Sequence, residues 1–171
     1  MILVSYDGSS DAQAAIDRVA QLMGGAEVTV LTVWEPFADM MTRTACAGFG
    51  LAGMSGDYAD TEAIDEHNSA AALVTATNGG GRATAAGLIA HPLAIRRHGG
   101  FANTILAAAG EMNADLVVLG TRGRSGVKSF LLGSVSQEVV QHADRPVLVV
   151  PSATLSEHRH DWIHAEVALY A

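Results

Sequence analysis

The sequence has little cysteine and little positive charge. Its 171 residues include one cysteine, Cys46, so no disulfide can form within the chain, which fits a reducing compartment. Ten Lys and Arg residues stand against eighteen Asp and Glu residues, which gives a formal charge of −8. Proteins that bind nucleic acid usually concentrate Lys and Arg to neutralise phosphates, so this balance argues against a nucleic-acid surface.

Long apolar runs are also missing. No stretch approaches the roughly 18 uninterrupted apolar residues that a membrane helix needs. Asp7 interrupts the apolar start and no basic region precedes it, which argues against a secretory signal. We therefore expect a soluble cytoplasmic protein with no membrane partner. With 49% hydrophobic residues, the chain is long enough for one domain with one substantial core.

Five short runs rich in Val, Ile and Leu predict β-strands. They are Met1–Tyr6, Glu27–Trp34, Leu88–Ile95, Asp115–Leu119 and Pro146–Val150. Nearly continuous apolar strands are typical of a parallel sheet that helices cover on both faces. The third run contains Pro92, which cannot donate a ladder hydrogen bond and therefore predicts an edge strand.

Helical spacing of apolar residues predicts four helices between these strands. The first helix begins at a capping box, Ser10–Gln13. The other three cover Asp60–Ala86, Ala102–Met112 and Ser134–His142. The glycines at 79–81 predict a break, a kink or weak order, because each costs about 1 kcal/mol relative to alanine in a helix. The alternation predicts a doubly wound, Rossmann-like α/β fold with a five-stranded parallel sheet and helices on both faces.

Two segments lie outside this alternation. Phe37–Gly56 has no clear periodicity and predicts a long mobile loop. The segment 153–171 fits either a short amphipathic helix or a partly ordered tail. His160 and His164 would share one face of such a helix, a spacing that can hold a metal. No second set of ligands accompanies them, so we favour a structural or surface role.

Ligands of open α/β sheets bind beyond the carboxyl ends of the strands, where the strand order reverses. The segment 120–136 follows a predicted strand and gathers three cations, Arg122, Arg124 and Lys128. Its glycines would let the backbone approach a ligand, and a helix start at Ser134 would favour phosphate oxygens. Neither the P-loop pattern nor G-x-G-x-x-G is present. Ser134–Gln137 is itself a capping box, so phosphate binding and simple capping both stay open.

Asp7 also has two interpretations. At the end of the first strand, its carboxylate could accept hydrogen bonds from ribose hydroxyls or hold a metal ion through water. Alternatively, Asp7 and Gly8 only make the turn into the first helix. No catalytic residue is assigned, because Asp7 is an isolated carboxylate and no histidine occurs between Gly120 and Ser136.

The start of the chain, "ILVSYDGSS", and the stretch "ADLVVLGTRGRSGVKSFLLGSVSQEVVQHADRPVLVV" together resemble the universal stress protein family. Its nucleotide-binding branch carries glycine, two residues, glycine, nine residues, glycine, then Ser or Thr. Gly120, Gly123, Gly133 and Ser134 reproduce that pattern. The resemblance covers about residues 1–151, leaving 152–171 as a C-terminal extension. It implies an adenine nucleotide alpha hydrolase-like fold.

The resemblance also implies a ligand, a set of contacts and a partner. ATP, with Mg²⁺ or Mn²⁺, would lie at the strand ends, with Asp7 near the ribose or a hydrated metal. The backbone of Val33 would meet adenine, and Leu119 and Gly120 would flank the sugar. The phosphates would be surrounded by Arg122, Gly123, Gly133, Ser134, Val135 and Ser136. A homodimer would form by pairing of the Pro146–Val150 strands.

Three functions remain open on the sequence. The first is an ATP-binding stress-response or signalling module, in which the nucleotide acts as a signal or conformational switch. The second is a slow ATP hydrolase on the same fold. The third is a nucleotide-free dimeric interaction module, since a fold alone does not establish a function.

Overall fold

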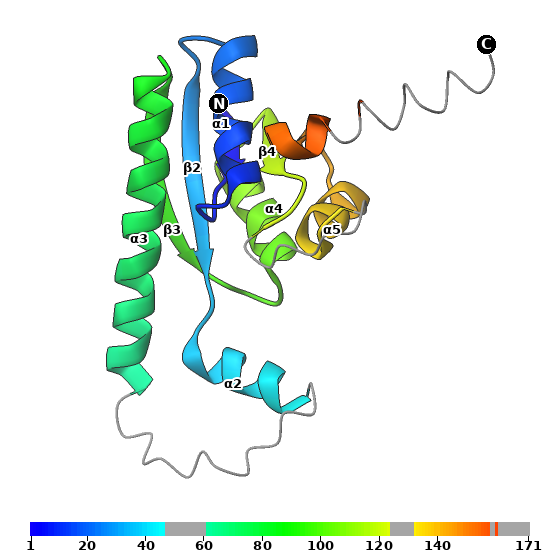
Figure 1. Ribbon diagram of the computed structural model, residues 1–171. Coiled ribbons are helices and arrows are strands. Elements are labelled where there is room, and N and C mark those ends of the chain that lie inside the picture. Colours follow the sequence, from blue (N-terminus) through cyan, green and yellow to red (C-terminus); the bar gives the residue numbers. More distant parts are fainter. Residues whose placement is uncertain (47–60, 124–131, 158–159, 161–171) are drawn as a thin grey trace, which may run out of the picture.

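The computed structural model describes residues 1–46, 61–123, 132–157 and 160. Its centre is a five-stranded parallel sheet with the order β3-β2-β1-β4-β5 (Figure 1). The strands are β1 (Ile2–Ser5), β2 (Glu27–Trp34), β3 (Ile89–Arg96), β4 (Leu116–Gly120) and β5 (Val147–Val150). The chain moves outward through β2 and β3 and then returns to the other side of β1. The doubly wound fold predicted from the sequence is therefore confirmed.

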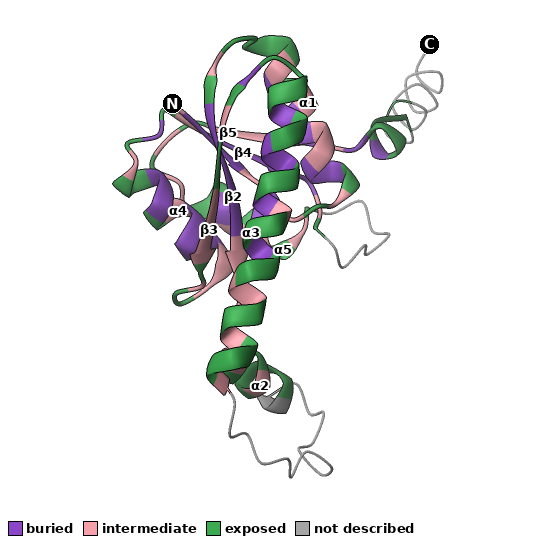
Figure 2. Cartoon of the chain, turned by 90° about the vertical axis from the view of Figure 1, so that its left-hand side faces the viewer, coloured by how far each residue is buried: buried purple, intermediate pink, exposed green. Residues whose placement is uncertain are grey.

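Helices cover both faces of this sheet. They are α1 (Ser10–Leu22), α2 (Phe37–Cys46), α3 (Thr61–Ala85), α4 (Phe101–Glu111) and α5 (Ser134–His142). Successive residues of a strand point to opposite faces. Val4 of β1 belongs to the core under α1 and α3, and Leu3 belongs to the core under α4 and α5. Both side chains are fully buried, so β1 lies between two apolar layers. Figure 2 shows buried residues on the strands and on parts of the helices around them.

Pro92 lies in β3, which forms one edge of the sheet. The prediction of an edge strand is therefore confirmed. The position suits proline because an edge strand bonds a neighbour on one side only.

The predicted break in the second helix is wrong, since α3 runs unbroken through the glycines at 79–81. A Cβ atom on Gly79 would lie 2.7 Å from Tyr6 Cδ1 and 2.8 Å from Val30 Cγ1. A Cβ atom on Gly80 would lie 3.6 Å from the ring of Pro92, which is an ordinary packing distance. Glycine thus lets α3 approach the sheet closely, and the packing outweighs the low helix propensity of these residues.

The predicted loop at Phe37–Gly56 is wrong over its first half, because residues 37–46 form α2. Tertiary contacts explain the difference. Asp65 of α3 accepts a hydrogen bond from the Phe37 N–H at 2.7 Å and so caps the start of α2. Both α2 and the lower part of α3 extend beyond the sheet (Figures 1 and 2). The rest of the predicted loop lies outside the described residues.

Neither predicted capping box forms. The N-cap of α1 is Ser9, whose Oγ accepts the Ala12 N–H at 3.2 Å, and Gln13 reaches back to the Gly8 carbonyl. Helix α5 starts after Gly133 without a side-chain cap. Both helices therefore begin where the sequence predicted, but through different atoms.

After β5 the chain makes a helical turn at 153–157, whose Leu155 is buried. His164 lies outside the described residues, so the structure does not test the histidine pair. Within the described ranges, no helix is long and apolar enough to cross a membrane.

Candidate functional site

A cavity of about 700 Å³ opens at the carboxyl ends of the strands, where the strand order reverses. Every residue that the sequence analysis placed around a nucleotide lines it, namely Asp7, Val33, Leu119, Gly120, Arg122, Gly123, Gly133, Ser134, Val135 and Ser136. These residues come from β2, β4, α5 and the loops that follow β1 and β4. The fold thus brings all ten to one place, as the rule for open α/β sheets requires.

The cavity has two chemically different ends. We call the part formed by Asp7, 120–123 and 133–136 the glycine end. The opposite part, which we call the α2 end, is lined by Val33, Trp34, Glu35, Met40, Arg43 and the α3 residues Asn68, Ala71 and Ala72. The sequence predicted the residues of the glycine end but, at the α2 end, Val33 alone.

Asp7 makes the turn into α1 and also lines the cavity. Its Oδ1 accepts the Ser9 N–H at 3.0 Å, and Gly8 adopts a φ of +84°, a conformation that favours glycine. A Cβ on Gly123 would lie 2.7 Å from Asp7 Oδ2. The two interpretations of Asp7 are therefore compatible, because the turn uses one carboxylate oxygen while the other faces the loop after β4.

The glycines of the motif have close contacts with the protein itself. A Cβ on Gly120 would lie 2.7 Å from the Asp11 carbonyl carbon and 2.9 Å from the Ala12 nitrogen. A Cβ on Gly133 would lie 3.3 Å from the Thr121 oxygen. Glycine is thus required at 120 by the approach of α1 to β4, before any ligand is considered.

Asp11 does not line the cavity but contacts Arg122, which does, and the sequence did not predict this contact. Asp11 is 4% exposed, yet its Oδ2 accepts the Arg122 N–H at 3.1 Å and lies 3.8 Å from Arg122 Nε. Its place in the first turn of α1 favours a negative charge. Asp11 therefore ties the loop after β4 to α1. An acid in a first helical turn is a common pattern, so the sequence alone gave no sign of this partner 111 residues away.

The start of α5 forms the far wall of the glycine end. Ser134 is exposed, whereas Ser136 is buried and donates its hydroxyl to the Gly120 carbonyl at 2.8 Å. The first backbone N–H groups of a helix have no partner within the helix and attract anions. Arg122 is the cation that the described residues place here. Arg124 and Lys128 lie outside the described residues.

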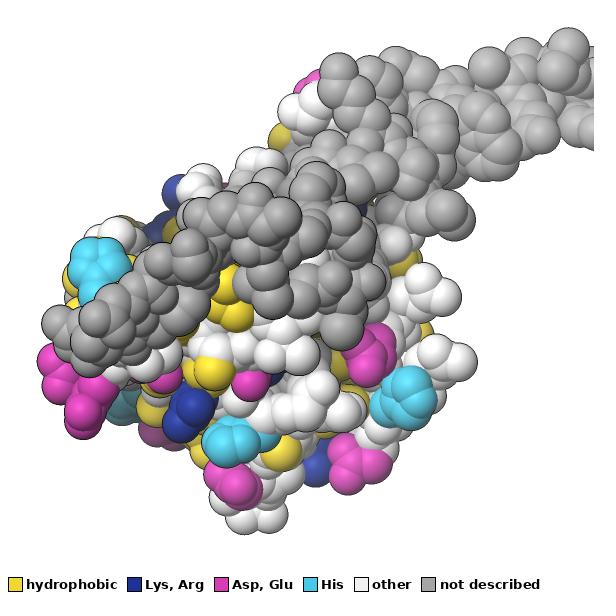
Figure 3. All heavy atoms as spheres, turned by 90° about the horizontal axis from the view of Figure 1, so that it is seen from below, with side chains coloured by type: hydrophobic (Ala, Val, Ile, Leu, Met, Phe, Trp, Pro, Cys, Tyr) yellow, Lys and Arg dark blue, Asp and Glu magenta, His cyan; other side chains and the backbone are white. Residues whose placement is uncertain are grey.

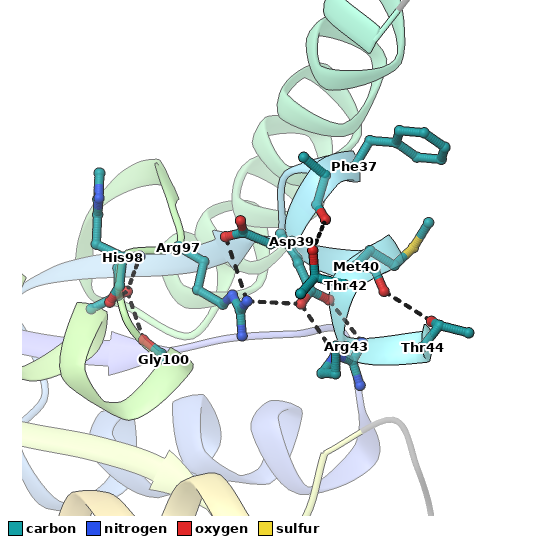
Figure 4. A network of polar contacts seen from close by, with 12 residues as sticks. Phe37, Asp39, Met40, Thr42, Arg43, Thr44, Arg97, His98 and Gly100 are labelled. Carbon is teal, nitrogen blue, oxygen red and sulfur yellow. Dashed lines mark hydrogen bonds and ion pairs between the residues drawn. The ribbon is translucent and has the colours of Figure 1, made fainter. Parts of the chain in front are cut away.

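Ion pairs hold the α2 end together. Glu35, whose side chain is 11% exposed, accepts two hydrogen bonds from Arg43 at 3.2 and 2.8 Å and lies 3.1 Å from Arg97 Nη2. The hydrogen bond and charge of Glu35 raise the pKa of Arg43. Figure 4 shows Arg97 reaching from the end of β3 toward Asp39 of α2. These contacts join α2 to the ends of two strands.

The face around this opening is mixed in charge. Figure 3 looks onto the carboxyl ends of the strands and shows Asp, Glu and His side chains between the Lys and Arg side chains. On the described part of that face, the cations form no continuous basic patch.

Comparison with known proteins agrees with this geometry. The model of the universal stress protein family matches residues 1–151. A universal stress protein of Thermus aquaticus, encoded in the QAH/OAS sulfhydrylase 3′ region, is 35% identical over 153 residues, which are 87% of this chain and 96% of the relative.

Solved structures share the fold. The protein MJ0577 superposes with a TM-score of 0.67 at 22% identity, covering 88% of this chain and 94% of its own. A universal stress protein in complex with cAMP gives 0.57 at 23% identity (89% and 96%). One from Archaeoglobus fulgidus in complex with dAMP gives 0.58 at 18% identity (87% and 95%). With its family model matched over most of its length, this chain belongs to the universal stress protein family.

Proposed function

We propose that this chain is an ATP-binding universal stress protein that holds the nucleotide as a signal or conformational switch in a stress response. The observation that carries the proposal is the convergence of ten residues from distant parts of the chain on one cavity at the switch point of the sheet. The cavity volume of about 700 Å³ suits a small molecule. The complexes of similar proteins with cAMP and dAMP support an adenine nucleotide as the class of ligand.

The two ends of the cavity suggest how the nucleotide lies. Phosphates would occupy the glycine end, where Arg122, the exposed hydroxyl of Ser134 and the start of α5 offer positive charge and hydrogen-bond donors. The base would occupy the α2 end, where Val33, Ala71 and other apolar side chains replace water around a flat ring. The sugar would lie between them, near Asp7 and Leu119.

A divalent metal, Mg²⁺ or Mn²⁺, fits this arrangement. Mg²⁺ bound with a nucleotide usually takes one or two protein carboxylates and completes its shell with phosphates and water. Asp7 supplies one carboxylate at the cavity wall, with Oδ2 toward the loop after β4. When bound, the ion would neutralise phosphate charge beside an otherwise repulsive acid.

We also propose a cytoplasmic homodimer with its nucleotide-binding domain at 1–151 and an extension at 152–171. The Pro146–Val150 strand forms the second edge of the sheet. Thr121 N–H donates to the Val150 carbonyl at 2.9 Å, so Val150 faces β4, and alternation turns the backbone groups of Val147 and Val149 to the open edge. Exposed edges of this kind favour pairing with a second strand.

The edge is tested by Val149→Pro, which removes an N–H donor from the open side without touching the bond to β4. We expect a dimer for the wild type and for Val149→Thr, and a monomer for Val149→Pro, by light scattering. A dimer that survives the proline would have to use another surface.

The nucleotide is tested by mass analysis of the ligand retained through purification and by calorimetric titration with ATP, with and without Mg²⁺. We expect retained adenine nucleotide and binding that Mg²⁺ strengthens. A sample that retains no nucleotide and shows no heat with millimolar ATP would contradict the proposal. Product release from radiolabelled ATP by wild type and by Asp7→Asn would show whether ATP is also hydrolysed.

A further inference from the structure

We infer that Asn68 is the specificity-determining residue for the base, and that its side-chain amide recognises the N6 and N7 edge of adenine. The inference rests on the proposed function, because it names the residue that would select the base in the same cavity. Asn68 lies on α3, far in sequence from the glycine motif, at the α2 end of the cavity.

One stripe of α3 faces the cavity. Asn68, Ala71, Ala72 and Thr75 line it, and their spacing of three, four and seven residues places them on one side of a helix. The two alanines are small and leave a flat apolar strip. Asn68 stands at one end of that strip, partly buried, where the edge of a ring lying on the alanines would end.

The neighbouring polar groups already have partners. Glu35 accepts hydrogen bonds from Arg43 and lies against Arg97. The Thr75 hydroxyl donates to the Ala71 carbonyl at 3.0 Å, as a helical threonine commonly does. Among the residues that the structure describes, no hydrogen-bond partner is found for the Asn68 amide. A donor and an acceptor are thus both available to a ligand at this point.

The position of Asn68 is well fixed. Asp65, one turn earlier on α3, accepts the Phe37 N–H at 2.7 Å and so attaches α3 to the start of α2. Glu35 in turn attaches α2 to the end of β3 through Arg97. Because both contacts flank the cavity, the amide is held at a set distance from the strand ends.

The chemistry of the amide selects the base. An Asn side chain can accept from the N6 amine of adenine while donating to N7, which forms two hydrogen bonds at once. Guanine offers two acceptors, O6 and N7, along the same edge, so the amide can make one good bond with guanine and faces an unpaired acceptor. The site therefore prefers adenine.

The experiment compares ATP, 7-deaza-ATP and GTP by calorimetric titration of the full chain. Replacing N7 by carbon removes one acceptor and leaves the ring shape unchanged. We expect the wild type to bind ATP about tenfold more tightly than either analogue. In Asn68→Ala the three affinities should converge to within about twofold, whereas Asn68→Asp, which keeps the acceptor for N6, should lose only the preference for N7.

Asn103→Ala is the matched control, since Asn103 is an exposed helical asparagine whose own side chain is not among those that line the cavity. It should leave all three affinities unchanged. An Asn68→Ala protein that folds like the wild type and keeps its full preference for ATP over 7-deaza-ATP would overturn the assignment of Asn68 alone. A wild type that binds none of the three nucleotides would overturn both this inference and the proposed function.

Discussion

The two ends of the cavity are built by different kinds of contact. At the glycine end, α1 and β4 lie so close together that Gly120 admits no side chain. At the α2 end, long charged side chains join α2 to β2 and β3 through ion pairs around Glu35. Close backbone packing tolerates almost no change, whereas an ion-pair network can lose a member and rearrange.

This difference predicts a steep response to substitution at one end and a graded response at the other. The two kinds of contact also differ in how well the sequence predicts them. Close contacts of glycine can be recognised in the sequence, because glycine is required at fixed positions. Ion pairs are hard to recognise, because a surface contains many charged residues.

The largest effect should come from Gly120→Ala. Its Cβ would meet backbone atoms of Asp11 and Ala12 at 2.7 to 2.9 Å, so α1 or β4 would have to move. We expect the free energy of unfolding to fall by about 3 kcal/mol, as for severe overpacking. Urea denaturation measures this loss.

Gly81→Ala is the control for that substitution. No atom lies within 4 Å of its added Cβ and the residue is helical, so we expect a gain of about 1 kcal/mol. Equal stabilities for the two variants would contradict the close approach of α1 to β4.

Glu35→Gln should have the next largest effect. The substitution keeps the size of the side chain but removes its charge, so Arg43 would lose a charge-assisted hydrogen-bond partner and Arg97 an ion-pair partner. We expect a loss of about 2 kcal/mol and faster hydrogen exchange over 37–46. Exchange in β1 should stay slow; acceleration there as well would mean that α2 is not an independent unit.

Ser134 and Ser136 of α5 separate a structural role from a ligand-binding role within the glycine end. Ser136→Ala removes the buried bond to the Gly120 carbonyl, so the free energy of unfolding should fall by about 1 kcal/mol. Ser134→Ala should leave stability unchanged, because Ser134 is exposed, and should weaken ATP binding about fivefold. The reverse pattern would show that the structural and ligand-facing roles are exchanged.

Asp39→Asn should have the smallest effect. Asp39 lies 3.5 Å from Arg97 with its side chain 44% exposed, so solvent weakens their attraction. We expect a change below about 0.5 kcal/mol by denaturation. A loss as large as that of Glu35→Gln would mean that Asp39, and not Glu35, anchors α2.

The sequence by itself determined the strands, the order of elements and the glycine end. Continuous Val, Ile and Leu runs can be buried only in a covered sheet, and the boundaries of β2 and α5 agree with the prediction. The family resemblance carried by Gly120, Gly123, Gly133 and Ser134 predicted a ligand at this end, and all four residues line the cavity. These features depend on residues close in the chain, which a pattern can detect.

Only the tertiary structure decided the rest. Gly79 and Gly80 stay helical because α3 packs there against Tyr6, Val30 and Pro92, and residues 37–46 fold into α2 because Asp65 caps it. Asn68 lines the cavity from α3, and Asp11 of α1 contacts the cavity residue Arg122. The stabilising contacts join residues that are distant in the sequence, as Asp65 and Phe37 are at a separation of 28 residues. Local helix and strand propensities carry no information about such distant partners.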